Sequence, residues 1–135
     1  MSTTDDFPTA LRYTREHEWA RSQGELIEVG ITAYAAHQLG DVVFVELPQV
    51  GSRITAGKPF GVVESVKSVS DLFAPLSGEV CAVNHALETA PERVNESPYN
   101  EGWMIRIRPD DAQSIETLLN ANAYADWLKQ SEGAH

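Results

Sequence analysis

Apolar residues fall along this chain in short runs that glycine and proline repeatedly interrupt. Residues 25–31 alternate in part between apolar and polar side chains, which is typical of a strand. The densest run, Val42–Val45, lies between Asp41 and Pro48 and predicts a strand that is covered on both faces. Residues 102–108 alternate apolar with basic positions and predict a half-exposed strand. Many short strands separated by turns indicate a β-sandwich or barrel with helices at its edge.

Helical signals are few. Thr32 is suited to cap a short helix over residues 33–39, and Gly40 is suited to end it. Residues 84–99 are polar and contain two prolines, so we expect a loop there with one helical turn.

Two more helices are predicted near the C-terminus, over residues 111–131. Asp110 or Asp111 can cap the first, which would run to about residue 120. The second is expected over residues 122–130, where leucine and aromatic side chains supply an apolar face.

The chain reads as one domain. Its 135 residues are 42% hydrophobic and 22% charged, and no linker or low-complexity segment divides them. A chain of this size buries roughly two-thirds of its unfolded surface, so it folds without disulfides or metal. We expect a single domain over residues 11–131, between a flexible tail over residues 1–10 and a short tail over residues 132–135.

One lysine lies between two apolar, β-branched runs. Residues 62–63 and 69–73 read as short strands, and the Ser-Val-Lys-Ser segment between them reads as a tight connection. Lys67 would then lie at the tip of a hairpin, with an amine that can be acylated. A lysine in a turn is usually only a solvated surface residue. Here glycine-punctuated strands bracket it on both sides, so we treat Lys67 as a candidate attachment point.

Charge limits the classes of partner. The formal net charge is -10, which argues against nucleic acid or an anionic membrane surface and favours partners with basic docking surfaces. No apolar run approaches the roughly 20 residues that span a bilayer. The acidic, polar start resembles neither a secretory signal nor a transit peptide, so we expect a cytoplasmic protein. The four histidines show no paired ligand spacing, and no metal site is expected.

An ordered set of short motifs resembles the H protein of the glycine cleavage system, within the biotinyl/lipoyl-attachment superfamily. The similarity spans roughly residues 11–131. The matching pieces are Tyr13, Glu16–Trp19, Val29–Thr32, Leu39–Pro48, Glu64–Lys67, Ser70–Asp71, Pro75, Ser77–Val80, Val83–Asn84, Pro91, Val94–Asn95, Ser97–Tyr99 and Gly102–Ile105. Departures are small: Ser68 stands where the family usually has alanine, and Glu16 replaces a small polar residue of some members.

The resemblance implies a mainly β fold with peripheral helices. This fold is a barrel-sandwich hybrid of two small antiparallel sheets, with a short helix near residues 33–39 and C-terminal helices near residues 111–131. It also implies a carrier subunit rather than an enzyme, with lipoic acid in amide linkage to Lys67. A monomer is our default expectation. The arm would carry the aminomethyl group of glycine from a pyridoxal-phosphate-dependent glycine decarboxylase to a tetrahydrofolate-dependent aminomethyltransferase. A dihydrolipoyl dehydrogenase would then reoxidise the arm.

Family positions also suggest site residues. Glu18 and Asp71 match a surface cleft into which the loaded arm folds, where a carboxylate can pair with its ammonium. Glu64, Ser65 and Val66 are candidates for recognition by the enzymes that install the arm, a lipoate ligase, or an octanoyltransferase followed by lipoyl synthase. A solvated strand-end carboxylate is an equally good interpretation of Glu64.

Other functions fit less well. Catalysis by the chain itself would need a nucleophile and base or paired carboxylates, and no motif supplies them. Biotin domains usually place methionine on both sides of the lysine, where Val66 and Ser68 stand here. Lipoyl domains of oxoacid dehydrogenases lack the segments at residues 16–19 and 99–103. An H-like protein that donates lipoyl groups to another lipoate-dependent complex remains the alternative.

Overall fold

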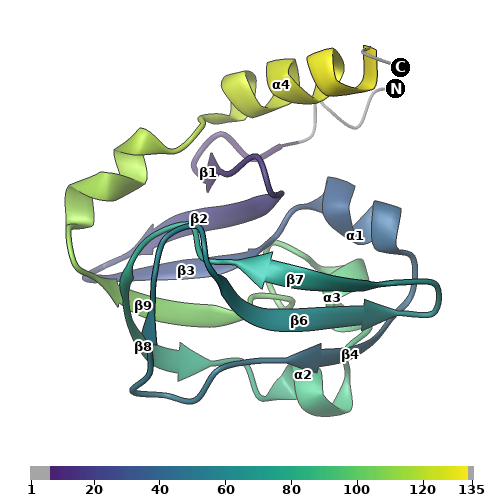
Figure 1. Ribbon diagram of the computed structural model, residues 1–135, viewed down its shortest axis with the longest axis horizontal. Helices are drawn as coiled ribbons and strands as arrows, with labels where there is room; N and C mark the ends of the chain where they lie inside the picture. The colour runs from purple at the N-terminus through teal and green to yellow at the C-terminus, as the bar shows by residue number, and fades with distance from the viewer. Residues whose placement is uncertain (1–6, 134–135) are drawn as a thin grey trace.

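The computed structural model of the protein describes residues 7–133 and is shown in Figure 1. Its strands are β1 Arg12–Tyr13, β2 Glu18–Gln23, β3 Leu26–Ile31, β4 Val42–Glu46, β5 Arg53–Ile54, β6 Pro59–Ser65, β7 Val69–Phe73, β8 Gly78–Val83 and β9 Ile105–Pro109. Its helices are α1 Ala33–Leu39, α2 Ala86–Thr89, α3 Arg93–Glu96, the 3₁₀ helix η2 Ala112–Thr117 and α4 Ala121–Gly133. No helix among these described residues is long and apolar enough to cross a bilayer.

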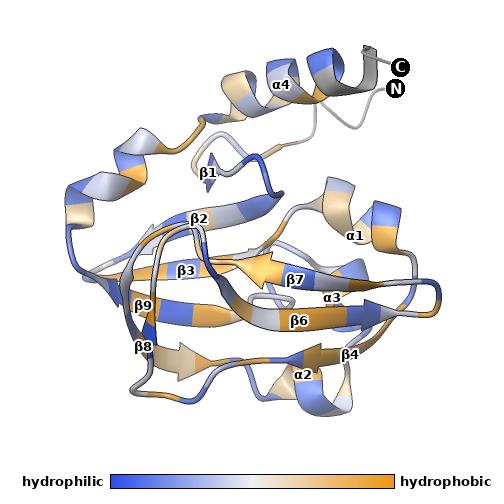
Figure 2. Ribbon diagram, viewed as in Figure 1, coloured by the Kyte–Doolittle hydropathy of each residue, from blue (hydrophilic) through white to orange (hydrophobic). Residues whose placement is uncertain are grey.

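The strands form two antiparallel sheets, ordered β1-β2-β3-β9-β8-β5 and β4-β6-β7. Buried side chains from both sheets make one core, to which Val29 and Ile107 of the first sheet and Val45, Val63 and Leu72 of the second contribute. In β9 hydrophobic and hydrophilic residues alternate, as expected for a strand with one buried face (Figure 2). The fold is a barrel-like sandwich rather than a closed barrel, which confirms the predicted fold class.

The β2–β3 hairpin depends on two glycines. Gly24 has a φ of +64° at the turn, a conformation that glycine adopts at little cost. Gly30 lies directly across from Trp19, and a Cβ atom there would come within 2.7 Å of the indole ring. Trp19 is fully buried, and its indole ring fills the space that a side chain at residue 30 would need.

The helix predictions are confirmed in place but not always in type. The hydroxyl oxygen of Thr32 accepts from the Ala35 N–H and caps α1, and Gly40 follows its last residue. Asp111 caps the next predicted helix, but that segment is a 3₁₀ helix of six residues. Asn120 accepts from Ala123 N–H and starts α4 earlier than expected. Residues 84–99 contain two short helices, α2 and α3, where one turn was expected.

The prediction that the strand at residues 42–45 is covered on both faces is wrong. Val43 and Phe44 are 51% and 49% exposed, although Val42 and Val45 are buried. The reason is a register shift between Val42 and Phe44 in the β4–β6 pairing, which places two consecutive side chains on the outer side.

A second cluster of buried residues lies between β1 and α4, which runs along one side of the molecule (Figure 1). The rings of Tyr13 and Tyr124 stack with centroids 4.9 Å apart, and Phe7 packs edge-on against Tyr124 at 4.8 Å. Phe7 is only 6% exposed, although it lies within the stretch expected to be a tail. The rest of that stretch up to residue 6 lies outside the described residues.

Candidate functional site

Lys67 lies at the tip of the β6–β7 hairpin. The last strand pair joins Glu64 to Val69, and the Ser65 N–H donates to the carbonyl of Ser68 at 2.8 Å. The hydroxyl oxygen of Ser65 lies 3.1 Å and 3.3 Å from the backbone nitrogens of Ser68 and Lys67, which donate to it. Hydrogen bonds among residues 65–68 therefore stabilise the turn, and the side chain of Lys67 remains exposed.

The residues beside Lys67 differ in what they offer a partner. Val66 and Val69 are 70% and 65% exposed, which is unusual for valine. Glu64 is half-buried, whereas Ser65 is buried and its hydroxyl oxygen accepts from the backbone of the turn. Of the predicted recognition residues, Val66 and Glu64 are accessible, and Ser65 has a structural role.

The side chain of Lys67 lies against the end of α1. A Cβ atom placed on Gly40 would be 3.4 Å from the Cε atom of Lys67. Gly40 also has a φ of +79°, which side chains rarely adopt. The chain thus keeps the surface under the lysine stem free of side chains.

A cleft of about 290 Å³ opens between α1, the start of β2 and β7. It contains both carboxylates that family position suggested, Glu18 from β2 and Asp71 from β7, although these strands belong to different sheets. Its remaining polar lining is Glu16, His17, Tyr34, Gln38 and Ser70, and its apolar lining includes Ile31, Leu39, Val63 and Leu72.

Glu18 is the unusual group in this cleft, since it is only 2% exposed. The Thr14 hydroxyl donates to its Oε1 atom at 2.7 Å, and the Phe73 N–H donates to its Oε2 atom at 3.2 Å. Burial raises the pKa of Glu18 to about 8, because these two hydrogen bonds only partly replace water around the charged form. No salt bridge joins Glu18 to a cation in the described part of the chain. It is therefore a buried acid without an internal counter-ion.

Sequence reasoning did not single out His17 or Tyr34, which line this cleft, or Thr14, which donates to Glu18. His17 has a φ of +73°, and among the described residues it is the one non-glycine with a positive φ. Strain of this kind costs of order 1–3 kcal/mol and concentrates at functional sites. Histidine is enriched among non-glycine residues with a positive φ, but most histidines have a negative φ, so the residue type alone does not identify this position.

A larger hollow of about 430 Å³ lies on another side of α1, lined in part by Ala33, His37, Asp41 and Asn95. Asn95 spends its side chain on the backbone of residues 36, 40 and 42. His37 and Asp41 are exposed. This hollow lacks a buried carboxylate, so the cleft with Glu18 is the better candidate site.

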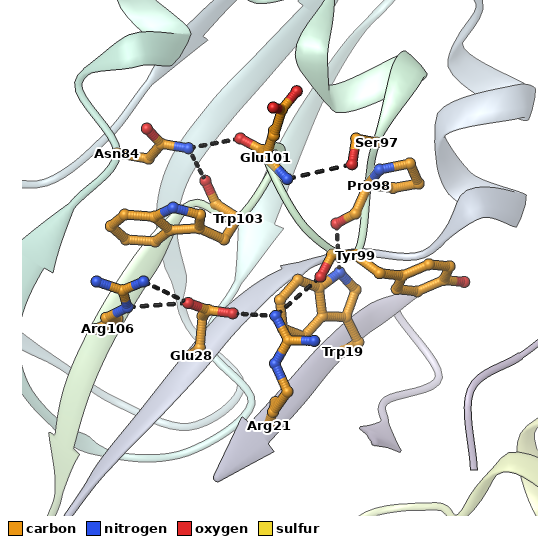
Figure 3. A network of polar contacts seen from close by, with 10 residues as sticks. All are labelled: Trp19, Arg21, Glu28, Asn84, Ser97, Pro98, Tyr99, Glu101, Trp103 and Arg106. Carbon is orange, nitrogen blue, oxygen red and sulfur yellow. Dashed lines mark hydrogen bonds and ion pairs between the residues drawn. The ribbon is translucent and has the colours of Figure 1, made fainter. Parts of the chain in front are cut away.

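A polar network behind the cleft orders the segment over residues 97–103 (Figure 3). Buried Glu28 forms ion pairs with Arg21 and with Arg106, whose Nε atom is 2.9 Å from the carboxylate. Arg21 also donates to the carbonyl of Tyr99 at 2.8 Å. The Tyr99 hydroxyl in turn accepts from the Ala33 N–H at 2.9 Å. The network thereby fixes the first residue of α1, the helix that lines the cleft.

Comparisons with known proteins agree with this geometry. Residues 11–131 match the family described as Glycine cleavage H-protein. The chain is 57% identical over 127 residues to the glycine cleavage system H protein of Anaeromyxobacter sp. (strain K), covering 94% of this chain and 99% of the relative. It is 58% identical over 123 residues to that of Geobacillus kaustophilus (strain HTA426), covering 91% and 97%.

A solved structure is similar as well. The crystal structure of a glycine cleavage system H protein from Mycobacterium marinum superposes with a TM-score of 0.83 at 40% identity. The match covers 90% of this chain and 98% of that one.

Proposed function

This chain belongs to the glycine cleavage H-protein family, a family of lipoyl carriers, and on that basis we propose that it carries lipoic acid on Lys67 as a non-catalytic subunit. It would take the aminomethyl group of glycine from a pyridoxal-phosphate-dependent decarboxylase to a tetrahydrofolate-dependent aminomethyltransferase. It would then present the dithiol to dihydrolipoyl dehydrogenase. The observation that supports this most is an exposed hairpin lysine four residues before Asp71, which lines a cleft that holds a buried acid without a salt-bridge partner.

The residues present fit a lipoyl group. Asp71 is four residues from Lys67, which limits their separation to about 14 Å, a span that an extended lipoyl-lysine covers. The apolar lining, with Leu39, Val63 and Leu72, suits a hydrocarbon chain. The carboxylate of Glu18 suits a cation at its end.

When attached, lipoic acid supplies a disulfide that is reduced as it accepts the aminomethyl group. The protein's own residues then have a protective task. Without the ammonium, burial keeps a proton on Glu18 at neutral pH. When the ammonium enters, this proton is released to solvent, and the Glu18 carboxylate accepts a hydrogen bond from the ammonium, which supplies the missing counter-ion. Asp71 is exposed and adds a second negative charge at the edge of the cleft. Since water is largely excluded around Glu18, hydrolysis of the labile arm is slowed.

Tethering explains why a carrier is useful. A group linked to the protein visits nearby sites at an effective concentration of order mM, whereas a free intermediate would diffuse away. Exposed Val66 and half-buried Glu64 flank the lysine, and we assign them to recognition by the lipoate ligase, or by the octanoyltransferase and lipoyl synthase that install the arm.

The test is reconstitution with the three partner enzymes. Release of CO₂ from carboxyl-labelled glycine should depend on the lipoylated protein and should vanish in Lys67→Arg, which keeps the charge but removes the acylatable amine. Lys58→Arg is the matched control, because Lys58 is also exposed but directly precedes β6, at the end of that strand far from the hairpin tip. Full activity of Lys67→Arg would refute the assignment.

A further inference from the structure

His17 is held from two directions beside the arm cleft. Its carbonyl accepts from the Thr32 N–H at 2.9 Å, and its Nδ1 atom lies 2.7 Å from the hydroxyl of Tyr124 on α4. That hydroxyl also lies 3.0 Å from the hydroxyl of Thr32. A residue with a left-handed backbone is thus clamped to the C-terminal helix and to the cap of α1.

The hydrogen bonds that link Thr32, Tyr124 and His17 have one set of donor directions that gives every hydroxyl hydrogen an acceptor. Thr32 is fully buried, and its oxygen already accepts from the Ala35 N–H. Its hydroxyl hydrogen therefore needs an acceptor, and among the described residues the Tyr124 oxygen is the one it reaches. The Tyr124 hydrogen must then point to Nδ1 of His17. The reverse order would leave the buried Thr32 hydrogen without a partner.

This direction fixes the state of the imidazole. With Nδ1 as acceptor, a neutral ring carries its proton on Nε2. Nε2 makes no hydrogen bond to the described residues, whereas Nδ1 is engaged by Tyr124. Since His17 lines the cleft, the Nε2–H is the polar ring group that is left for an occupant. Burial also lowers the pKa of His17, which keeps the ring uncharged at neutral pH.

We propose that Tyr124 holds His17 as the neutral Nε2–H tautomer, so that the imidazole neither pairs with Glu18 nor competes with it for the ammonium of the loaded arm. An imidazolium in the same cleft as Glu18 would act as a competing counter-ion and would repel the ammonium. A ring with a lone pair on Nε2 would compete as an acceptor and draw the ammonium away. His17 and Tyr124 are positioning residues in this account, and the account rests on the proposed lipoyl function.

The first experiment needs no arm. Long-range ¹⁵N–¹H NMR of unmodified protein should show His17 as the Nε2–H tautomer at pH 7. Tyr124→Phe keeps the aromatic ring but removes the donor, and should bring in the Nδ1–H tautomer. Tyr13→Phe is the matched control, because its ring stacks on Tyr124 but its hydroxyl donates to the Pro8 carbonyl instead. An imidazolium or an Nδ1–H ring in the wild type overturns the proposal.

The second experiment uses protein whose lipoylation has been verified by intact mass. The reduced arm is loaded with formaldehyde and ammonium, which join it with loss of one water, and retention is followed by mass spectrometry. Tyr124→Phe should lose the aminomethyl group about two- to tenfold faster than wild type, as expected for one hydrogen bond. Tyr13→Phe should match wild type. Unchanged retention in Tyr124→Phe overturns the inference, whereas a wild type that accepts no lipoate overturns the proposed function and leaves the NMR result to decide the tautomer.

Discussion

The Oε2 atom of Glu18 accepts a hydrogen bond from the backbone N–H of Phe73 at 3.2 Å. These residues are 55 positions apart and belong to different sheets. Phe73 ends β7, the strand that begins two residues after Lys67. The bond therefore ties the buried acid of the cleft to the same hairpin that presents the lysine.

Replacing Glu18 by Gln should shorten the life of the loaded arm. The amide has nearly the same shape but carries no charge, so it cannot form the charge-assisted hydrogen bond, which we expect to be worth about 1.5–3 kcal/mol. Loss of the aminomethyl group, followed by mass spectrometry, should be at least about tenfold faster. Glu25→Gln, in the exposed β2–β3 turn, is the control. Equal decay in the two variants would remove Glu18 from this role.

The same buried acid predicts a pH dependence of stability. Burial raises the pKa of Glu18 to about 8 from an ordinary value of 4.5, so the folded protein keeps a proton there that the unfolded chain has lost. The free energy of unfolding should therefore fall as pH rises from about 5 to 8, by on the order of 1 kcal/mol per pH unit from this group.

Urea unfolding of wild type and Glu18→Gln across this pH range isolates the contribution of Glu18, because the other carboxylates are common to both. The free energy of unfolding of wild type, minus that of Glu18→Gln, should decrease steadily between pH 5 and pH 8. A constant difference would show that Glu18 ionises normally.

Glu28 should matter for stability rather than for chemistry. It is 1% exposed and joins Arg21 and Arg106, so Glu28→Gln leaves two arginines without their shared counter-ion. We expect a loss of about 2–3 kcal/mol in urea unfolding, below the full cost of breaking a buried pair because both arginines are partly exposed. Glu79→Gln, which breaks an exposed pair with Arg108, should change stability by less than about 1 kcal/mol. Equal losses would refute a central role for Glu28.

Gly30 should not tolerate a methyl group. In Gly30→Ala the new Cβ atom would come within 2.7 Å of the buried Trp19 ring, which must move. We expect a loss of about 1–3 kcal/mol, the usual cost of overpacking a core, measured by thermal or urea unfolding. Gly24→Asn is the comparison, because nothing lies within 4 Å there and asparagine tolerates a positive φ. A Gly30 variant as stable as the Gly24 variant would contradict this packing.

Local sequence patterns predicted the turns and helix caps of this protein, but they could not predict features that depend on contacts between distant segments. The lysine hairpin follows from β-branched runs around a short polar turn, and the caps at Thr32 and Asp111 follow from side-chain chemistry. The exposure of Val43 and Phe44 arises from a bulge, which depends on pairing with another strand.

The cleft shows the same limit more strongly. Glu18 and Asp71 come together only because the two sheets face each other, and similarity to a family, rather than spacing, suggested them. His17 meets Tyr124 across 107 positions, and only the packing of α4 creates that contact.

The measurement that tests the central claim most directly is peptide-mapped mass spectrometry after incubation with a lipoylating enzyme, lipoate and ATP. The chain has three lysines, Lys58, Lys67 and Lys129, all exposed, so exposure alone would not select among them. If the lipoylating enzyme recognises the β6–β7 hairpin, we expect one lipoyl group per chain, attached to Lys67 alone. A folded protein that remains unmodified, or is modified equally at Lys58 and Lys129, would contradict the account.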